Sequence, residues 1–360
     1  MSVHDHASRL AAVRLADGIC IPMALQAAID LKVFEIIADA GPEAQLSTSE
    51  MIAKMNTSNP HAAATLERIL RVLVTDSILT LSVRSDGEGG RTEPVYGLTD
   101  ESRFLVPDED GTSVASLVQL CLDRATVEGM YYLKDFVIQG KRPPFEIVHG
   151  VDVFEFGSKE PKYNKLFHDA MSSFSVIVLN VLLEVYKSFN EVKQVMDVGG
   201  GIGTSISFMV SHFPHVHGVN FDLPHVIASA PHYSGVEHVE GNMFEGVPNA
   251  ENIFMKLVLH DWGDDHCIQL LKNCWNALPD GGKVINVDFV IPSVLGTDAI
   301  SRRTATEDLN MIAYTSGGKE RTLAEFDKIA KAAGFAETKD IPISLGIHVL
   351  EFHKRLSLNN

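Results

Sequence analysis

Gln194-Val195-Met196-Asp197-Val198 runs directly into Gly199-Gly200-Gly201-Ile202-Gly203-Thr204, and this junction decides the fold. A short apolar strand is followed there by a glycine-rich turn and then by a helical segment, SISFMVSHF. Strand, glycine turn and helix in this order are typical of a doubly wound sheet that binds its ligand beside the turn. The sequence therefore predicts a mostly parallel, Rossmann-like α/β domain around residues 194–204.

From Val192 onward, strand candidates alternate with helices, which is the pattern of a mostly parallel sheet. They cover residues 194–198, 216–221, 237–240, 252–259, 283–290 and 347–352. Ligands of such sheets bind at the carboxyl ends of the strands, so the residues that follow each strand are the candidates for chemistry.

The N-terminal residues follow a different pattern, in which helices precede a hairpin. Asn59-Pro60 is expected to begin a helix, with asparagine as N-cap and proline at the first helical position. The expected elements are a helical stretch to about residue 40, a short helix at 47–55, an amphipathic helix carrying Leu66, Ile69, Leu70, Leu73 and Val74, and strands at 79–83 and 95–98 around a turn at 86–90. This order predicts a helical, winged-helix-like module for packing or dimerisation.

The polar stretch Pro107–Thr112 separates this module from the rest, so we place the domains at residues 1–111 and 112–360. The chain has 360 residues, 45% of them hydrophobic, which is long enough for two cores and excludes a disordered protein. Its 47 acidic and 30 basic residues give a net charge of −17, which disfavours binding to nucleic acid or anionic lipid. A small-molecule partner is expected instead.

The four cysteines form no CxxC pair and no secretory signal is visible at the N-terminus, which indicates a cytoplasmic protein. The longest apolar run, residues 176–185, falls short of the roughly 20 residues that a membrane span needs. We therefore expect no membrane partner.

The spacing of the glycines distinguishes between cofactors. A dinucleotide fingerprint would place glycine at Thr204, whereas Asp197, Gly199, Gly201 and Gly203 match the turn that admits S-adenosylmethionine close to the backbone. Asp222 ends the next strand, 23 residues after Gly199, where a carboxylate can accept both ribose hydroxyls. Capping of the following helix is the structural alternative for Asp222.

Six segments in order resemble the plant small-molecule O-methyltransferases of the caffeic acid, flavonoid and alkaloid type, and the likeness runs from Leu10 to the C-terminus. They are VMDVGGGIGTSI, NFDLPHVI, GNMFEGVP, MKLVLHDWGDDHCIQLLKNC, PDGGKVINVD and GGKERTLAEFDKIAKAAGF. The resemblance implies S-adenosylmethionine as cofactor, S-adenosylhomocysteine as product, and a homodimer. It also implies His260 as general base between Asp288 and Glu320, and cofactor contacts from Ser175, Gly199, Gly201, Asp222, Asn242, Met243 and Lys256. Asn242 departs from the aspartate that is usual in the family.

Methyl transfer to oxygen needs a general base, because a neutral hydroxyl is a poor nucleophile. A phenol has a pKa near 10 and histidine about 6.5, so full proton transfer would cost about 5 kcal/mol and is expected to accompany attack. A carboxylate behind the imidazole fixes its tautomer and stabilises the imidazolium.

The acceptor is expected to be a flat aromatic hydroxyl compound held by apolar side chains. Candidates are Phe167, Met171, Phe174, Trp262 and Met311. Phe174 stands where the lignin-monomer branch often carries histidine, by the same resemblance, which puts caffeate in doubt. Phenylpropanoid, flavonoid, lignan and isoquinoline alkaloid acceptors remain open, as does which hydroxyl is methylated.

Three alternatives are weighed against this interpretation. The segment HDWGDDH at residues 260–266 could bind a metal, but acids in a first helical turn are favoured by the helix dipole, so no metal is expected. A nicotinamide oxidoreductase is disfavoured by Thr204. A catalytically idle, cofactor-binding interaction protein is suggested by Asn242.

Overall fold

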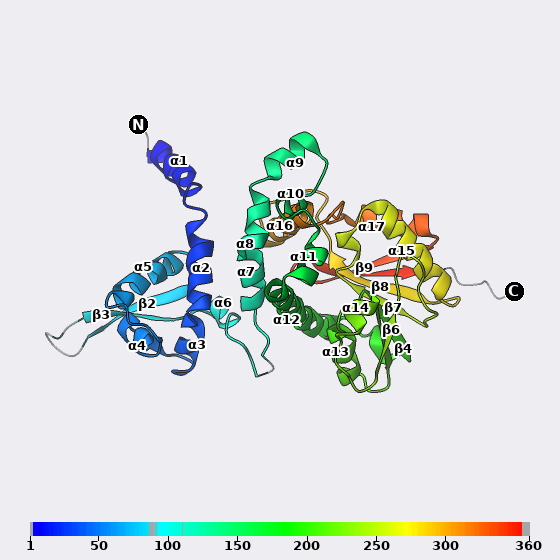
Figure 1. Cartoon of the computed structure of the whole chain (residues 1–360), viewed down its shortest axis with the longest axis horizontal. Coiled ribbons are helices and arrows are strands. Elements are labelled where there is room, and N and C mark those ends of the chain that lie inside the picture. The colour runs from blue at the N-terminus through cyan, green and yellow to red at the C-terminus, as the bar shows by residue number, and fades with distance from the viewer. Residues whose placement is uncertain (1–2, 86–89, 91, 110, 355–360) are drawn as a thin grey trace. The chain divides into compact units, whose positions relative to one another are not determined.

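The computed structural model describes residues 3–85, 90, 92–109 and 111–354, with side chains from residue 6 onward. Two compact units are present (Figure 1). The first contains the residues up to Arg124 together with 162–174, and the second contains 125–161 and the residues from Ser175 onward. The long helix α12 (Pro161–Val185) contributes to both units. The domain boundary between residues 111 and 112 stays a prediction.

The first unit has the helix, helix and hairpin order that the sequence predicts. A three-stranded antiparallel sheet in the order β1-β3-β2 packs against helices whose apolar side chains include Phe34, Met51 and Leu70, all fully buried. The unit comprises α1 (Val3–Arg14), α2 (Cys20–Asp30), α3 (Val33–Ala38), β1 (Gln45–Leu46), α4 (Thr48–Ala53), α5 (Ala62–Thr75), β2 (Leu79–Ser85), β3 (Thr92–Leu98), α6 (Asp100–Arg103) and α7 (Ala115–Leu122).

One predicted helix start in this unit is wrong. Helix α5 begins at Ala62 after His61, and Asn59 instead accepts a hydrogen bond from the backbone N–H of His61, at 3.0 Å. Asparagine favours such local turns as readily as helix caps, so the pattern alone places the start two residues too early. The predicted apolar face is confirmed, since Leu66, Leu70 and Leu73 are buried. Most of the predicted hairpin turn, residues 86–89, lies outside the described residues.

The second unit is built on a seven-stranded sheet in the order β6-β5-β4-β7-β8-β10-β9. The first five strands in this order are parallel to one another, and β10 pairs antiparallel with both β8 and β9. The strands are β4 (Gln194–Val198), β5 (His217–Asp222), β6 (Val236–Glu240), β7 (Ile253–Lys256), β8 (Lys283–Phe289), β9 (Glu337–Ser344) and β10 (Ile347–His353). The strand order reverses between β4 and β7, which opens a crevice at their carboxyl ends.

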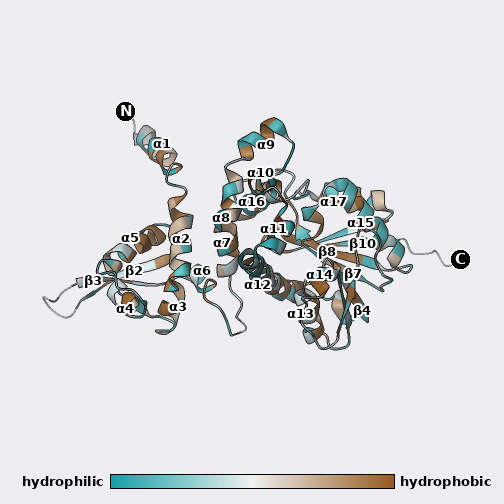
Figure 2. Ribbon diagram, viewed as in Figure 1, coloured by the Kyte–Doolittle hydropathy of each residue, from teal (hydrophilic) through white to brown (hydrophobic). Residues whose placement is uncertain are grey.

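Helices cover both faces of this sheet (Figure 1). Helix α15 (Asp264–Ala277) and helix α17 (Leu323–Ala333) bury apolar faces against one side, where Cys267 and Cys274 are fully buried as predicted. Both helices show mostly hydrophilic residues on the side seen in Figure 2. Helix α13 (Thr204–His212) packs on the other side, close against Gly218 of β5.

The remaining helices of the second unit are α8 (Arg124–Met130), α9 (Leu133–Gln139), α10 (Pro144–His149), α11 (Val153–Lys159), α14 (Pro224–Ile227) and α16 (Ala299–Tyr314), with short 3₁₀ turns η1 (Ser188–Asn190) and η2 (Leu259–Asp261). Helix α12 is long and apolar enough to cross a membrane by length and composition alone. Its residues Val178, Leu179 and Leu182 are buried within the protein, which is the behaviour of a core helix.

In the second unit, two strands differ from the predicted set by more than one residue at an end. Strand β7 ends at Lys256 instead of continuing to Leu259, because Leu257 adopts a left-handed backbone conformation (φ 55°) that ends the extended chain. The turn η2 follows, so His260 lies in a 3₁₀ turn and does not directly follow the strand. Strand β9 has a mixed sequence of charged and apolar residues, and it is absent from the predicted set.

The guanidinium of Arg321 joins the segment after β7 to the segment before α17. Its Nη1 donates to the carbonyl of Leu259 at 2.7 Å, and Nη2 donates to the carbonyl of Trp262 at 2.7 Å. Both Nε and Nη2 donate to one oxygen of Asp264, at 3.1 and 2.9 Å. Arg321 is fully buried, so these hydrogen bonds form away from water and fix the segment around His260.

We expect Arg321→Met to lower the free energy of unfolding of the second unit by about 3 kcal/mol, because two buried carbonyls and one carboxylate lose their donor. Both tryptophans, Trp262 and Trp275, belong to the second unit, so their fluorescence in a urea titration reports on this unit. Arg302→Met is the matched control at an exposed position. Equal stability of the two variants would contradict the role assigned to Arg321.

Candidate active site

The glycine-rich turn and His260 lie at the carboxyl ends of adjacent strands, where the strand order reverses. Gly199 follows β4, and η2 with His260 follows β7. Val258, two residues before His260, packs against the glycine-rich turn, because a Cβ atom on Gly199 would lie 3.1 Å from a methyl group of Val258. The topology therefore brings the predicted cofactor turn and the predicted base to one edge of the sheet.

His260 is held from behind by acids and is almost fully buried, with 7% of its surface exposed. Its Nδ1 lies 2.9 Å from Oε1 of Glu320 and 3.7 Å from Oδ1 of Asp288. When Nδ1–H donates to Glu320, the lone pair of the neutral imidazole is on Nε2. The structure thus brings together the three residues that the sequence predicts as a catalytic group.

A third acid, Asp261, lies on the other side of the ring, with Oδ1 3.7 Å from Nε2 of His260. Burial by itself lowers the pKa of His260, but the charges of Asp288, Asp261 and Glu320 outweigh it and raise the pKa to about 10. Burial raises the pKa of Glu320 to about 7 and that of Asp261 to about 6. The pKa of Asp288 is also raised, chiefly by burial.

Ligand atoms of His260, Asp288 and Glu320 lie within 4.8 Å of one another, a spacing that a metal ion could use. Both acids, however, approach the same ring nitrogen, and the 2.9 Å separation from Glu320 is that of a hydrogen bond. Asp264 of the HDWGDDH segment binds Arg321 and begins helix α15. The arrangement matches an imidazole oriented by carboxylates.

The backbone approaches other groups closely along the glycine-rich turn. Gly199, Gly201 and Gly203 all have positive φ angles, of 72°, 60° and 90°. A Cβ on Gly201 would meet no atom within 4 Å, whereas one on Gly200 would lie 2.2 Å from the amide oxygen of Asn220. Gly201 therefore leaves the open space that the sequence predicts for a ligand, and Gly200 is required for packing inside the protein.

Asp222 is oriented by the backbone at the end of β5. Its Oδ2 accepts from the N–H of Gly201 at 2.8 Å, and its Oδ1 accepts from the N–H of Leu223 at 2.7 Å. Each carboxylate oxygen has a second lone pair, so the group can still accept hydrogen bonds from a ligand. The two backbone donors fix the direction in which it does so.

Behind the turn, the buried carboxyl of Asp197 interacts electrostatically with the partly buried Lys256. Burial raises the pKa of Asp197 to about 7, while Lys256 opposes this rise. Burial lowers the pKa of Lys256, partly offset by Asp197, Asp288 and Asp261. Among the described residues, Oδ2 of Asp197 has no hydrogen-bond partner. Lys256 thus connects the cofactor turn electrostatically with the acids around His260.

The segment after β6 carries the remaining cofactor candidates of this edge. Asn242 forms a local turn, in which its Oδ1 accepts from the N–H of Phe244 and its Nδ2 donates to Glu245, both at 3.0 Å. The sulfur of Met243 lies 3.9 Å from a Cβ built on Gly199. Trp262 packs edge-on against Phe244, with centroids 4.7 Å apart, so its ring lies beside this segment.

The other candidates are on two helices. Met311 is buried on α16, and Ser175 is buried on the part of α12 that belongs to the second unit. The acceptor candidates Phe167, Met171 and Phe174 are on the part of α12 that belongs to the first unit. The assignments of these five residues stay predictions.

Sequence reasoning missed Asp261, Arg321 and Asn220. In the sequence analysis, Asp261 appears only within the segment HDWGDDH, and Arg321 only within a family motif. The signals that could have identified them were weak, because a charged residue beside a strand end is commonly solvated. Their importance depends on burial, which a single sequence does not display.

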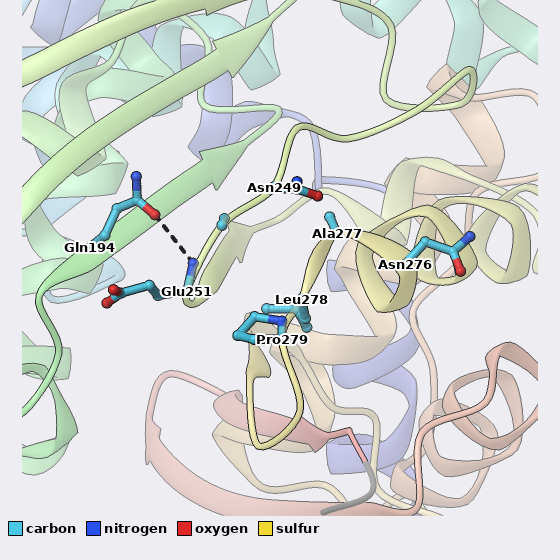
Figure 3. Close-up of a pocket in the computed structure, with 8 residues that line it drawn as sticks. Gln194, Asn249, Glu251, Asn276, Ala277, Leu278 and Pro279 are labelled. Carbon is cyan, nitrogen blue, oxygen red and sulfur yellow. Dashed lines mark hydrogen bonds between the residues drawn. The ribbon is translucent and has the colours of Figure 1, made fainter. Parts of the chain in front are cut away.

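A hollow of about 410 Å³ lies at the opposite edge of the sheet (Figure 3). It is formed by the start of β4, the segment before β7 and the end of α15, and the side chain of Gln194 there accepts from the N–H of Glu251 at 3.2 Å. None of its lining residues belongs to the predicted site. The strand ends that carry His260 remain the candidate active site.

Comparisons with known proteins agree with this geometry. The O-methyltransferase domain profile matches residues 130–336, and the O-methyltransferase dimerisation domain profile matches residues 13–108. The (S)-scoulerine 9-O-methyltransferase of Coptis japonica is 53% identical over 98% of this chain and 91% of that protein. Caffeic acid 3-O-methyltransferase 1 of Populus kitakamiensis is 44% identical over 98% of this chain and 96% of that protein.

The structure of human N-acetylserotonin methyltransferase in complex with SAM superposes with a TM-score of 0.81, covering 99% of this chain and 100% of that one. At 23% identity this likeness shows the fold alone. The sequence matches go further, since they extend over nearly the whole of each protein. The two domain profiles also match this chain one after the other, the dimerisation domain first and the O-methyltransferase domain second. This chain therefore belongs to the O-methyltransferase family and carries the dimerisation domain of that family at its N-terminal end.

Proposed function

We propose that this protein transfers the methyl group of S-adenosylmethionine to an aromatic hydroxyl of a plant specialised metabolite, with His260 as general base. The observation that supports it best is the imidazole of His260, which is bound to Glu320 through Nδ1 and lies beside the glycine turn at the strand ends. Named relatives act on (S)-scoulerine and caffeic acid. The acceptor is accordingly a phenylpropanoid, flavonoid, lignan or isoquinoline alkaloid.

The residues around the glycine turn fit a cofactor that combines a cation with a ribose. Asp222 is a pre-oriented acceptor for a ribose diol, and the space above Gly201 allows close approach to the backbone. Among the described residues, Oδ2 of Asp197 is buried without a hydrogen-bond partner, so it is available to accept a hydrogen bond from a ligand. Ser175, Asn242, Met243 and Lys256 complete the proposed cofactor contacts.

S-adenosylmethionine, when bound, supplies a methyl group activated by its sulfonium. The acceptor hydroxyl then donates its proton to Nε2 of His260 as oxygen attacks. Glu320 accepts the hydrogen bond from Nδ1–H and, with Asp288, stabilises the imidazolium. The acids raise the pKa of His260, so its neutral imidazole is a stronger base than an ordinary one and accepts the phenol proton at less than the cost of about 5 kcal/mol expected for an ordinary imidazole. The imidazolium form must first lose its proton, which happens at higher pH.

Phe167, Met171, Phe174, Trp262 and Met311 are proposed to hold the aromatic acceptor by apolar contact. The dimerisation domain indicates a homodimer as the working form. We also propose a cytoplasmic location, because the four cysteines form no CxxC pair, a pattern that suits a reducing compartment.

The direct test is a mass-spectrometric screen of catechol and guaiacol-type acceptors with S-adenosylmethionine, in which products one methylene heavier are scored. We expect at least one such product. A chain that binds the cofactor but methylates no acceptor in a wide panel would support the alternative of an idle interaction protein.

His260→Gln should lower kcat for the best acceptor by about 10²–10⁴-fold, because the variant lacks the proton acceptor. The affinity for S-adenosylhomocysteine, measured by calorimetry, should stay unchanged and thus control for folding. His266→Gln, at an exposed histidine of the same segment, is the matched control. Unchanged kcat in His260→Gln would refute the assignment of the base.

The acids around His260 set the pH dependence. Because the pKa of His260 is raised, the neutral form that can accept a proton increases with pH above the ordinary histidine range, and kcat should rise with pH. Asp288→Asn removes one charge that raises this pKa, so the rising part of the profile should move to lower pH. A shift to higher pH, or an unchanged profile, would contradict this electrostatic account.

A further inference from the structure

Strand β5 holds Gly201 of the glycine-rich turn through both of its backbone polar groups. The N–H of Gly201 donates to Oδ2 of Asp222 at 2.8 Å, and the carbonyl of Gly201 accepts from Nδ2 of Asn220 at 2.9 Å. Asn220 and Asp222 are two residues apart on the strand, so their side chains project to the same face. The position of Gly201 is therefore determined by two side chains of β5, of which only Asp222 is a proposed cofactor contact.

His238 on the neighbouring strand β6 orients the amide of Asn220. The two residues are paired in the parallel register of β5 and β6, and Nδ2 of Asn220 lies 3.2 Å from Nδ1 of His238. Nε2 of His238 lies 2.9 Å from the carbonyl of Pro231, which can only accept. The proton of the neutral ring is thus on Nε2, and Nδ1 accepts from Asn220.

This arrangement leaves only one favourable orientation for the Asn220 amide. A flipped amide would direct Oδ1 at both the carbonyl of Gly201 and the lone pair of His238, and both contacts would be repulsive. In the observed orientation Oδ1 has no hydrogen-bond partner among the described residues, although Asn220 is fully buried. The amide therefore forgoes a bond at its oxygen in order to donate to Gly201 and His238.

Two of the glycines in the turn are explained by this pair. A Cβ on Gly200 would lie 2.2 Å from Oδ1 of Asn220, and a Cβ on Gly203 would lie 3.1 Å from Cε1 of His238. The turn is thus packed directly on Asn220 and His238. A side chain at either glycine would force the turn away from this support.

We infer that Asn220 and His238 are positioning residues for the cofactor turn, which hold Gly201 where Asp222 can receive the ribose of the cofactor. The inference rests on the proposed function. Neither residue is assigned to touch the cofactor, since both act through the backbone of Gly201. Displacement of Gly201 would also move the N–H that orients Asp222, so the proposed ribose acceptor would lose its fixed direction.

The test is calorimetric titration of the full-length protein with S-adenosylhomocysteine. Asn220→Asp keeps the shape of the side chain but replaces the donor with an oxygen that repels the Gly201 carbonyl. We expect Kd to rise about tenfold. The KM for S-adenosylmethionine should rise in parallel, while the KM for the acceptor stays within about twofold, which a general loss of structure would not produce.

His238 provides a matched pair of variants. His238→Asn places an amide oxygen near the position of Nδ1 and retains an acceptor for Asn220, whereas His238→Leu removes the acceptor. We expect His238→Asn to bind S-adenosylhomocysteine within about threefold of wild type and His238→Leu to bind about tenfold more weakly. Tryptophan fluorescence in urea confirms that each variant is folded before titration.

Wild-type affinity in Asn220→Asp, or equal affinities in the two His238 variants, would overturn the inference. If Asn220→Asp does not fold, the comparison of His238→Asn with His238→Leu decides it alone. Failure of the proposed function is a separate result, because it would appear as a wild-type protein that methylates no acceptor in the screen, whatever affinities the variants show for S-adenosylhomocysteine.

Discussion

The buried guanidinium of Arg321 is the interaction on which the active site depends. Four hydrogen bonds from this one group reach two carbonyls and one carboxylate between Leu259 and Asp264, so the segment that carries His260 is fixed on both sides of the histidine. A backbone hydrogen bond strengthens this connection, because the N–H of Lys319 donates to the carbonyl of His260 at 2.9 Å. Glu320 lies between Lys319 and Arg321 in the sequence, and both of these neighbours are bound to the histidine segment. The distance between Glu320 and the imidazole is therefore fixed by these contacts.

Close packing explains why this connection needs glycine. A Cβ on Gly318 would lie 2.2 Å from the hydroxyl of Thr315 and 2.5 Å from the carbonyl of His260. A larger residue would separate the two segments, and the hydrogen bond between His260 and Glu320 would lengthen. Thus Arg321 provides the attraction and Gly318 allows the approach.

The electrostatics of the site follow from an excess of acids in a buried space. Asp261, Asp288 and Glu320 surround one imidazole, and the charges of Lys256 and Arg321 oppose the rise in the pKa values of Asp261 and Asp288, respectively. Burial raises the pKa values of the three acids, and their combined charge raises that of His260. Each group is adjusted by the others, so removal of one acid is expected to change the protonation of the whole cluster.

The sequence predicted much of the second unit because its signals are local. The strand before the glycine turn and the position of Asp222 follow from strand ends and motif spacing, whereas the acids flanking His260 were implied by the family resemblance. The end of β7 and the start of α5 were wrong, since a left-handed leucine and a local asparagine turn leave no clear pattern. Gly200 has no assigned role in the sequence analysis, and the structure shows that it packs against Asn220 of the neighbouring strand β5.

By itself, the sequence determined the fold class and the family, because both depend on the order and spacing of residues along the chain. Only the tertiary structure decided which polar residues are buried together. Arg321, Asn220 and His238 look like ordinary polar residues in the sequence. Arg321 and Asn220 gain their roles because folding removes them from water and requires their donors to find acceptors within the protein. His238 gains its role because the register of β5 and β6 places it beside Asn220.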